Sequence, residues 1–359
     1  MKVLGLMSGT SADGVDLVLA ELDGRPPTLT SRVLEHRYRP FPEGLATRVR
    51  LAQQNREGAP RQLGMLHADL GRFFAESAAP FRGRAELAAL AGQTVWHEPP
   101  YLTWQLGEPS WLAEALGVAV VHDFRPADLA AGGQGAPLVP YPDLLVYGEE
   151  GVRRSIHNIG GISNLSYLPG RDPAGVVAFD TGPGNCLIDE AAALLGEEYD
   201  PEGSIAASGT VDETLLETWS NHAYLRQAPP KSTGREVWRL DRLAFVERLK
   251  GADLLATVTA FTARTIVDAY RNFVLPLGLD EVWVAGGGAK NKTLMSEIRA
   301  GLPLPVLTFD EAGRDPMVRE ALAFAVLGYL RYLELPNVLP QTTGAARAAL
   351  AGRVSLPAV

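Results

Sequence analysis

The chain has 359 residues, of which 46% are hydrophobic, and a formal net charge of −9. This length predicts two domains of roughly 150 to 200 residues each, and the acidic balance argues against nucleic acid or an anionic membrane surface as a partner. Cys186 is the single cysteine, so a disulfide framework and a cysteine-based zinc site are excluded within one chain. The first apolar run is too short for a signal peptide and no stretch is long enough to span a membrane, which predicts a cytoplasmic protein.

The first part of the chain predicts a β-hairpin, then helices, then further strands. Residues 3–7 and 16–22 read as two strands joined by a polar glycine loop, and not as the strand-to-helix step of a dinucleotide-binding unit. The spacing of apolar residues over 42–78 predicts helices. Two more strands are expected at 87–90 and 118–121.

The second part predicts a new run of short strands around glycine turns, followed by helices. The expected strands are 144–147, 155–159, 165–168, 176–179 and 282–285. The expected helices are 186–196, 211–220, 241–249, 253–274 and the strongly apolar 319–333. The hairpin, strands and helices therefore occur twice, which predicts an α/β fold of two related domains with a cleft between them. We place the domains at 1–140 and 141–359, with the final segment packing back on the first.

Three glycine-rich segments join or follow predicted strands: 5–16, 157–164 and 284–291. Glycine lets the backbone approach a phosphate, Ser and Thr add hydrogen bonds, and a helix N-terminus after the third segment is an anion site. Asp13 and Asp16 of the first segment could hold a divalent cation. Ordinary turn chemistry is the alternative for the first segment. Together, the three are best explained by one nucleotide clamped between two domains.

Asp180 ends an apolar strand and precedes a rigid Gly-Pro-Gly turn, where a carboxylate would be held in position. This is a suitable place for a general base, and the alternative is that Asp180 caps the following helix. His97, His122 and His157 have no partner at zinc-ligand spacing, so structural roles are favoured for them.

Taken in order, the motifs of this chain resemble those of one family, the anhydro-N-acetylmuramic acid kinases of the actin/hexokinase-like superfamily. The motifs are GLMSGTSADGVD at 5–16, GQT at 92–94, DFRPADLAAGGQGAPLVP at 123–140, NIGGISN at 158–164, FDTGPGN at 179–185, PPKSTGRE at 229–236, GGGAKN at 286–291, REALAFA at 319–325 and TGA at 343–345. One departure is visible, because Ala91 stands where we expect the family to have His.

The resemblance implies two actin-like, ribonuclease H-like domains with a nucleotide and sugar cleft, and a homodimer. It implies that ATP and Mg²⁺ are used to convert 1,6-anhydro-N-acetylmuramic acid to N-acetylmuramic acid 6-phosphate in the recycling of cell-wall peptidoglycan. In this reaction the hydrolytic opening of the anhydro ring is coupled to phosphoryl transfer. The partners implied are therefore two small molecules, ATP and an anhydro amino sugar.

The resemblance also implies roles for particular residues. The ATP-binding residues would be Gly9, Thr10, Ser11, Ala12, Asp13, Gly14, Val15, Asp16, Asn158, Gly160, Gly161, Gly286, Gly287, Gly288 and Asn291, with Asp13 and Asp16 nearest the metal. Asp180 would activate water for attack at the anomeric carbon, and Gln93, Arg125 and Glu320 would line the sugar side with it. Arg125, Lys231 and Arg235 are the candidates for binding the lactyl carboxylate of the sugar.

Two rival functions remain at this point. Another sugar kinase of the superfamily would share the ATP loops and use Asp180 as the base on a free hydroxyl group. In that case, oxygen from labelled water would not be incorporated at the anomeric carbon. An actin-like filament or nucleotide switch would hydrolyse ATP without any added sugar. For the kinase, a site divided between two domains predicts an open form without ligands and a closed form with both ligands.

Overall fold

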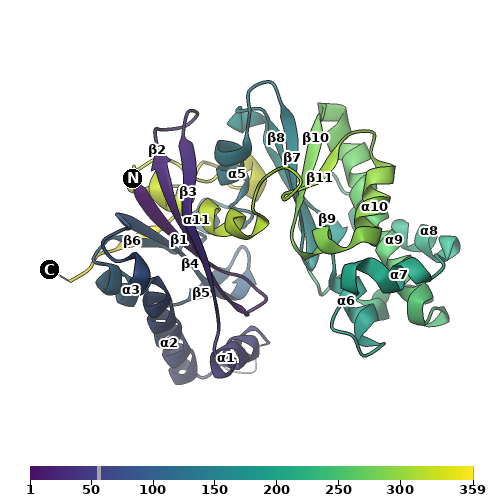
Figure 1. Ribbon diagram of the computed structural model, residues 1–359, viewed down its shortest axis with the longest axis horizontal. Helices are drawn as coiled ribbons and strands as arrows, with labels where there is room; N and C mark the ends of the chain where they lie inside the picture. Colours follow the sequence, from purple (N-terminus) through teal and green to yellow (C-terminus); the bar gives the residue numbers. More distant parts are fainter. Residues whose placement is uncertain (55–57, 359) are drawn as a thin grey trace. The chain divides into compact units, whose positions relative to one another are not determined.

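The computed structural model describes residues 1–54 and 58–358 and divides the chain into two compact units (Figure 1). Unit 1 combines residues 1–147 with 317–359, and unit 2 comprises residues 148–316. Unit 2 is therefore continuous in sequence, whereas unit 1 is built from both ends of the chain.

Unit 1 contains a seven-stranded sheet within the described residues. Its strands are β1 Lys2–Ser8, β2 Gly14–Asp23, β3 Thr30–Pro40, β4 Leu87–Glu98, β5 Leu102–Leu106, β6 Val120–His122 and β12 Arg353–Ser355. Its helices are α1 Glu43–Gln53, α2 Pro60–Ala78, α3 Pro109–Leu116, α4 Pro126–Ala130, α5 Pro140–Tyr147, α11 Arg319–Tyr332 and α12 Pro340–Thr343. The strand order is β12-β6-β4-β1-β2-β3, and β5 pairs with β4.

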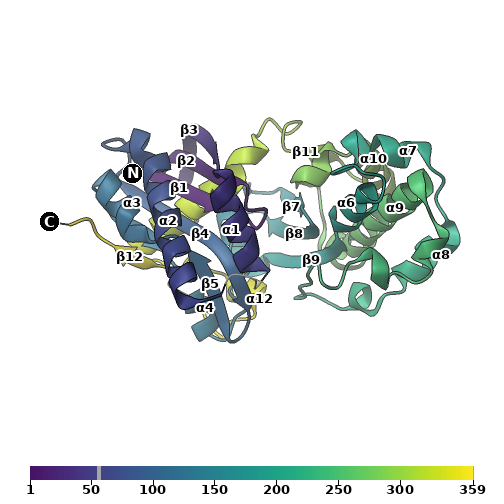
Figure 2. The same cartoon turned by 90° about the horizontal axis from the view of Figure 1, so that it is seen from below.

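Helices cover both faces of this sheet, as Figures 1 and 2 show. Alternate residues of β1 point to opposite faces: Leu4 and Leu6 pack into a core with α1, α2 and α3, and Val3 packs into a second core with α11 and α5. Helix α11 lies very close to β1: the space beside Gly5 is so small that an added Cβ would collide with the carbonyl oxygen of Ala321.

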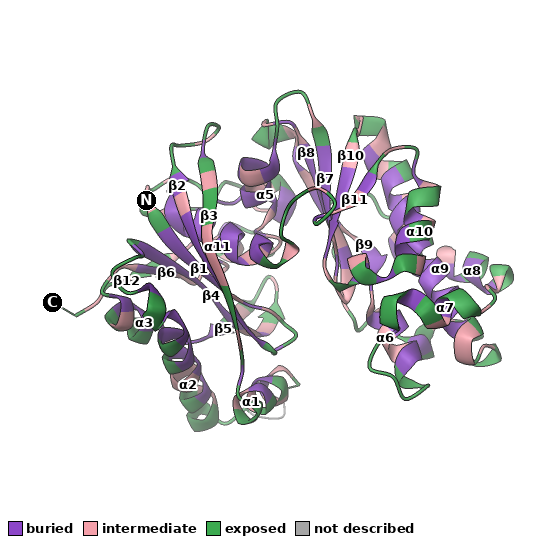
Figure 3. Ribbon diagram, viewed as in Figure 1, coloured by how far each residue is buried: buried purple, intermediate pink, exposed green. Residues whose placement is uncertain are grey.

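Unit 2 contains a five-stranded sheet in the described residues, in the order β11-β10-β7-β8-β9. The strands are β7 Arg153–Ile159, β8 Ile162–Pro169, β9 Val177–Pro183, β10 Glu281–Ala285 and β11 Val306–Thr308. The helices are α6 Cys186–Ala193, α7 Ser204–Ser208, α8 Glu213–Ser220, α9 Gly251–Ala269 and α10 Lys292–Gly301. Helix α9 is buried along most of its length (Figure 3) and joins one large core with α6, α8 and α10.

The two sheets share one topology. In each, three antiparallel strands form a meander, and two further strands run parallel to the first: β3-β2-β1-β4-β6 in unit 1 and β9-β8-β7-β10-β11 in unit 2. This repeat is the ribonuclease H-like arrangement, and it confirms the expected α/β class with two related domains. The carboxyl ends of parallel strands, where ligands of open α/β sheets bind, carry the glycine loops in both units.

Most predicted elements are present, and two are wrong. The hairpin of β1 and β2 is confirmed, and the helical segment 42–78 forms α1 and α2, although its residues 55–57 lie outside the described residues. The expected strand 144–147 is part of helix α5, because a short apolar run does not distinguish a strand from a buried helix. The expected helix 241–249 is two short 3₁₀ turns, because Phe245 between them has a left-handed φ of 61°.

Candidate active site

The first glycine loop connects β1 to β2 and is held by side chains that bind its carbonyl groups. Gln93, which is fully buried in β4, donates from Nε2 to the carbonyl of Gly9 at 3.0 Å. The hydroxyl of Ser8 lies 2.6 Å from Oε1 of Gln93, and Gln53 of α1 donates to the carbonyl of Thr10 at 3.2 Å. Two amide side chains thus hold the loop through its carbonyl groups.

The N–H groups of this loop are left available. Within the described residues, no hydrogen bond uses the N–H of Gly9, Thr10 or Ser11, whereas the N–H of Ala12 donates to the carbonyl of Gly9 at 3.2 Å. Consecutive backbone N–H groups in a turn form a concave anion site. The loop therefore has the geometry expected of a phosphate-binding turn.

The two carboxylates predicted to lie nearest a metal differ in their contacts. Oδ1 of Asp16 lies 2.8 Å from Nε2 of His36 on β3, and Asp13 accepts a hydrogen bond from Ser11 at 2.9 Å. No group of three or more His, Cys, Asp or Glu that could hold a metal ion was found among the described residues. Mg²⁺ in nucleotide sites is usually held by one or two carboxylates together with phosphate oxygens and water, and Asp13 and Asp16 fit that pattern.

The second glycine loop connects β7 to β8 and is held by backbone. The carbonyl of Gly160 accepts from the N–H of Asn185 at 2.7 Å, and the carbonyl of Gly161 accepts from Gly184 at 3.0 Å and Cys186 at 3.1 Å. Both carbonyls thus face the start of α6, and no hydrogen bond within the described residues uses the N–H of Gly161. The guanidinium group of the exposed Arg235 lies directly over Gly161.

The third glycine loop follows β10 and packs against the second. Gly286 has a φ of 85° and lies against the carbonyl of Ile159, and Gly288 lies against the side chain of the same residue. Asn291 caps α10 by accepting from the N–H of Leu294 at 2.9 Å. A cavity of about 770 Å³ opens beside this loop. Ala289, Lys290 and Tyr199 are among the residues that line it.

The glycines of the three loops fall into two groups. Gly14, Gly286 and Gly288 are required by the fold, because a Cβ at any of them would collide with backbone or buried side-chain atoms, whereas a Cβ at Gly161 would meet only the guanidinium group of the exposed Arg235, which can move. Gly9, Gly160 and Gly287 have no left-handed φ, and the atoms nearest to an added Cβ lie at 3.6, 3.6 and 3.3 Å. At least one glycine in each loop is therefore not demanded by packing, as expected where a ligand approaches the backbone.

Asp180 lies within β9, opposite Asn164 of β8, and three contacts fix it. Its Oδ2 accepts from the N–H of Thr233 at 2.9 Å, its own N–H donates to the carbonyl of Lys231 at 3.1 Å, and its carbonyl accepts from the hydroxyl of Tyr224 at 2.7 Å. The N-cap residue of α6 is Asn185, so the helix-capping alternative for Asp180 is wrong. The strand also continues to Pro183, so Asp180 is not at its end.

Burial raises the pKa of the Asp180 carboxyl to about 6, and the Thr233 N–H and the Lys231 ammonium act in the opposite direction. A carboxylate with this pKa is ionised at neutral pH and is a stronger base than an exposed aspartate. The group therefore has both the fixed position and the proton affinity that a general base needs.

The three candidates for the lactyl carboxylate occupy different environments. Lys231 is only 8% exposed, and its Nζ donates to the carbonyls of Tyr224 and Leu225 at 3.3 and 3.2 Å. Arg125 donates to the carbonyl of Gly135 at 2.8 Å. Arg235 is the most exposed of the three cations and lies over the second glycine loop. Lys231 is the least suited to receive a ligand carboxylate, because it is the most buried of the three and already donates to two carbonyls.

In unit 1, α11 brings Glu320 near Asp16 and Arg125, two other residues predicted for the site. Burial raises the pKa of the Glu320 carboxyl, the Asp143 and Asp16 carboxylates raise it further, and the Arg319 and Arg125 guanidinium groups lower it. Three residues predicted from distant parts of the sequence are thus electrostatic neighbours within one unit. Gln93, the fourth unit 1 residue of interest, directs its side chain at the first loop.

Ala91 lines a smaller cavity of about 200 Å³ in unit 1. His67, His122, Glu108 and Asp123 also line it. Nδ1 of His67 accepts from the N–H of Gly107 at 3.0 Å, and Nε2 of His122 lies 3.0 Å from the hydroxyl of Ser355. These histidines have structural partners, as predicted for His122.

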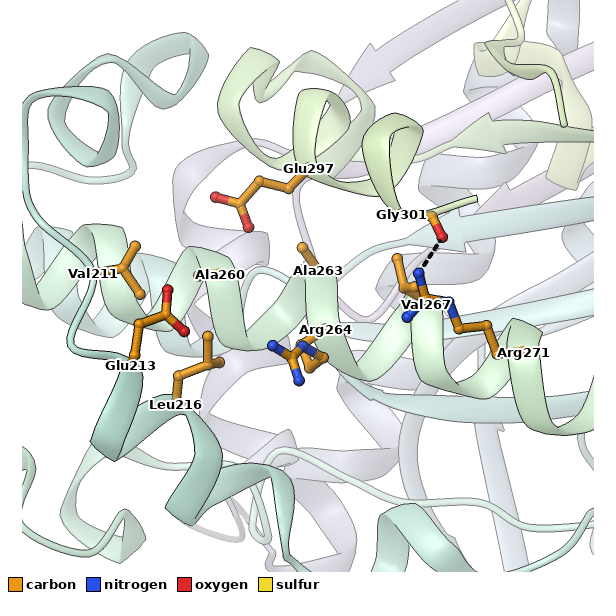
Figure 4. A pocket seen from close by; sticks show the side chains of 10 residues that line it. All are labelled: Val211, Glu213, Leu216, Ala260, Ala263, Arg264, Val267, Arg271, Glu297 and Gly301. Atoms are coloured by element: carbon orange, nitrogen blue, oxygen red, sulfur yellow. Dashed lines mark hydrogen bonds between the residues drawn. The ribbon is translucent and has the colours of Figure 1, made fainter. Parts of the chain in front are cut away.

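A further cavity, of about 460 Å³, lies in unit 2 among α8, α9 and α10 (Figure 4). Glu213 and Glu297 extend into it, and burial together with the charge of Glu213 raises the pKa of Glu297. Arg271 at one end donates to the carbonyl of Gly301 at 2.8 Å. None of the predicted site residues lines this cavity.

The contacts of Asp180 include residues that the sequence reasoning did not select. Tyr224 and Thr233 touch Asp180 directly, and Gln53 and Ser8 hold the first loop. Thr233 lies within the PPKSTGRE motif, which could have identified it. Nothing in the local sequence around Tyr224 or Gln53 marks either residue, because their roles depend on contacts formed only in the folded chain.

The comparisons with known proteins decide the family. The model for anhydro-N-acetylmuramic acid kinase matches residues 1–357. A relative with that name from Gloeobacter violaceus is 44% identical over 370 residues, covering 98% of this chain and 97% of the relative. Another from Cyanothece sp. is 40% identical over 378 residues, covering 99% of each. The chain belongs to the anhydro-N-acetylmuramic acid kinase family.

The kinases of this family are phosphotransferases, so the chain is an enzyme of that class. Its likeness to solved structures is weaker. The activator of 2-hydroxyisocaproyl-CoA dehydratase from Clostridium difficile with bound ADPNP is 13% identical, with a TM-score of 0.45, and the match covers 93% of this chain and 96% of that chain. No helix among the described residues is long and apolar enough to cross a membrane.

Proposed function

We propose that this protein is an ATP-dependent kinase that converts 1,6-anhydro-N-acetylmuramic acid to N-acetylmuramic acid 6-phosphate in peptidoglycan recycling. The observation that carries the proposal is Asp180. Three contacts fix this carboxylate in place, and burial raises its pKa to about 6. Simple transfer to a free hydroxyl group and activation of water both use such a base. Membership of the family supports the second role.

The phosphate half of the reaction depends on positioning and charge stabilisation. The N–H groups of Gly9, Thr10 and Ser11, which have no hydrogen-bond partner among the described residues, would bind phosphate oxygens, and the N–H of Gly161 would do so from the second loop. The cavity beside the third loop would receive the adenosine. Gly9, Gly160 and Gly287, which the fold does not require, support a close approach of the nucleotide to all three loops.

In the hydrolytic half of the reaction, Asp180 acts as the general base in one proton transfer. Asp180 takes a proton from water, the water oxygen bonds to the anomeric carbon, and the bond from that carbon to the bridging oxygen breaks. The released O6 then attacks the γ-phosphorus of ATP, and ADP leaves. One water, one ATP and the anhydro sugar give the 6-phosphate, ADP and a proton.

Mg²⁺ would neutralise phosphate charge during the transfer. In this chain Asp13 and Asp16 would hold it, directly or through water. Arg125 and Glu320 would contact the sugar, and Arg235 or Arg125 would pair with its lactyl carboxylate. Gln93 would act mainly by holding the first loop. We also propose that the protein is cytoplasmic and a homodimer, as the family resemblance implies, with a domain boundary near residue 140 and the final segment of the chain packing back on the first domain.

A single experiment tests the proposal. The protein is incubated with the anhydro sugar, ATP and Mg²⁺ in ¹⁸O-labelled water, and the products are weighed by mass spectrometry. We expect N-acetylmuramic acid 6-phosphate carrying one label at the anomeric oxygen immediately after turnover. A phosphorylated sugar with its anhydro ring intact, or ATP hydrolysis that is independent of sugar, would contradict the proposal and favour one of the two rival functions.

A further inference from the structure

Lys231 is a buried lysine whose charge no carboxylate neutralises directly. It is 8% exposed, and no salt bridge to it is present among the described residues; its Nζ is instead held by the two carbonyls of Tyr224 and Leu225. The ammonium also lies 4.8, 4.9 and 5.7 Å from the ring centres of Tyr224, Phe273 and Phe179. Aromatic faces and carbonyls stabilise a cation in a place where water is largely excluded.

This cage fixes the ammonium relative to Asp180. Phe179 directly precedes Asp180, and Tyr224 donates its hydroxyl to the Asp180 carbonyl. The Lys231 carbonyl accepts the N–H of Asp180, and Thr233, two residues further on, donates to its carboxylate. The segment 231–233 therefore binds both the backbone and the side chain of Asp180, and it also places a positive charge near that side chain.

The two charges support each other against burial. Burial raises the pKa of Asp180 to about 6 and lowers the pKa of Lys231 to about 8, and each group shifts the other back toward its charged form. Tyr224 is the other titratable group here, and its pKa is raised far above neutrality, by burial and then by Asp180. Arg235, on the same loop, acts on Cys186 and Asp189. Between about pH 6 and pH 8 the pair is charged on both sides.

We propose that Lys231 is a positioning residue that keeps the Asp180 carboxylate ionised and correctly placed to take a proton from the reacting molecule. Two of the three donors of the Lys231 ammonium are committed to backbone carbonyls within unit 2, so its role in this proposal is exerted through Asp180 and not on the substrate. The inference deepens the proposed function and depends on it only where turnover is measured.

The direct test is a carboxyl titration by ¹³C NMR on the full-length protein with ¹³C-labelled aspartate, the Asp180 signal being assigned with Asp180→Asn. In the native protein we expect a main inflection near pH 6 and a second, smaller one near pH 8, as Lys231 loses its proton. In Lys231→Met the main inflection moves to higher pH by about one unit and the second disappears. Lys231→Arg keeps the charge and restores the native midpoint.

Tyr224→Phe is the matched control, because it removes a contact to Asp180 and leaves the charge in place, so the midpoint stays near its native value. If Asp180 titrates at the same pH in Lys231→Met and the native protein, the inference is overturned. Should the methionine variant not fold, as judged by circular dichroism, the native titration alone decides, since a single inflection contradicts the coupling.

Turnover adds a second readout. The acid side of the kcat profile should move to higher pH in Lys231→Met by the shift seen in NMR, while the KM for ATP stays within about twofold. A uniform loss of kcat at every pH would indicate a purely structural role and overturn the inference. If the native protein does not phosphorylate the sugar at any pH, the proposed function fails, and the NMR titration still decides whether Lys231 controls Asp180.

Discussion

The turn between β1 and β2 in unit 1 and the turn between β7 and β8 in unit 2 occupy equivalent places in two sheets of the same strand order, yet they are held differently. In the first, side-chain amides of Gln93 and Gln53 bind the loop carbonyls. In the second, backbone N–H groups at the start of α6 bind them. In both, the protein engages loop carbonyls, and no hydrogen bond among the described residues uses the N–H of Gly9, Thr10, Ser11 or Gly161.

The difference shows that one binding geometry can be specified in two ways. The first turn depends on individual side chains, so it should be sensitive to a single substitution at a distance along the chain. The second depends on close backbone packing, which requires glycine at 184 because a Cβ there would collide with the carbonyl of Gly160. Substitutions in the two regions should therefore fail in different ways.

The largest effect on turnover is expected at Asp180 of β9, opposite Asn164 on the strand that follows the second turn. Asp180→Asn keeps the shape of the side chain and removes the base, so kcat should fall by about 10²- to 10⁴-fold. ATP affinity, measured by calorimetry, should change little, because the glycine loops are intact. A variant that retains more than half of the native turnover would contradict the assignment.

The pH dependence of turnover is the next effect in size. Burial raises the pKa of Asp180 to about 6, and a base must be deprotonated to act, so kcat should fall as the pH is lowered through about 6, by about tenfold per unit below it. The profile is measured between about pH 5 and pH 7.5, with the fold checked by circular dichroism at each pH. A rate that is constant down to pH 5 would exclude Asp180 as the base.

Gly9→Val examines the first turn without disturbing the fold. The atom nearest to an added Cβ is Ser11 Oγ at 3.6 Å, so the melting temperature should be nearly unchanged. A side chain there would block phosphate from the loop N–H groups, and losing one such charged hydrogen bond weakens ATP affinity by roughly tenfold or more. Gly44→Val, at an exposed site with open space, is the matched control, and equal ATP affinities in the two variants would mean that the turn is an ordinary one.

Gln93→Leu tests whether side chains set the first turn. It removes the hydrogen bonds to Gly9 and Ser8 and leaves buried polar groups unpaired, at a cost of about 1–3 kcal/mol in the free energy of unfolding. Gln105→Leu in β5 loses hydrogen bonds to two threonines and touches no loop. Both variants should unfold at lower urea concentration, and only Gln93→Leu should also bind ATP more weakly, by a few fold. Equal ATP affinities would show that the turn holds its shape without Gln93.

Much of the fold could be predicted because its signals are local. The hairpin of unit 1 is marked by two apolar runs around a glycine loop, and the final helix by a long apolar run. The strand expected at 144–147 could not be distinguished from a helix, because four apolar residues fit both. The helix expected at 241–249 is interrupted by the left-handed Phe245, a conformation that no residue pattern indicates.

The candidate site was predicted as motifs and not as contacts. The sequence marks Asp180 through the turn that follows it, and the glycine loops through their composition. It does not indicate that the 231–233 segment folds over Asp180, since this segment lies about 50 residues further along the chain. The sequence likewise does not indicate that the Lys231 ammonium donates to the carbonyls of Tyr224 and Leu225 inside the protein.

The return of α11 to unit 1 has a consequence for the order of events during protein synthesis. The face of the first sheet that includes Val3, Val18 and Ala20 is covered by α11, which the ribosome makes after the whole of unit 2. Until then those strands expose apolar surface, the condition in which nascent chains aggregate or bind chaperones. Unit 2 is continuous, and every strand of its sheet emerges before α11 does. The unit that begins the chain is thus expected to be the second to complete its folding.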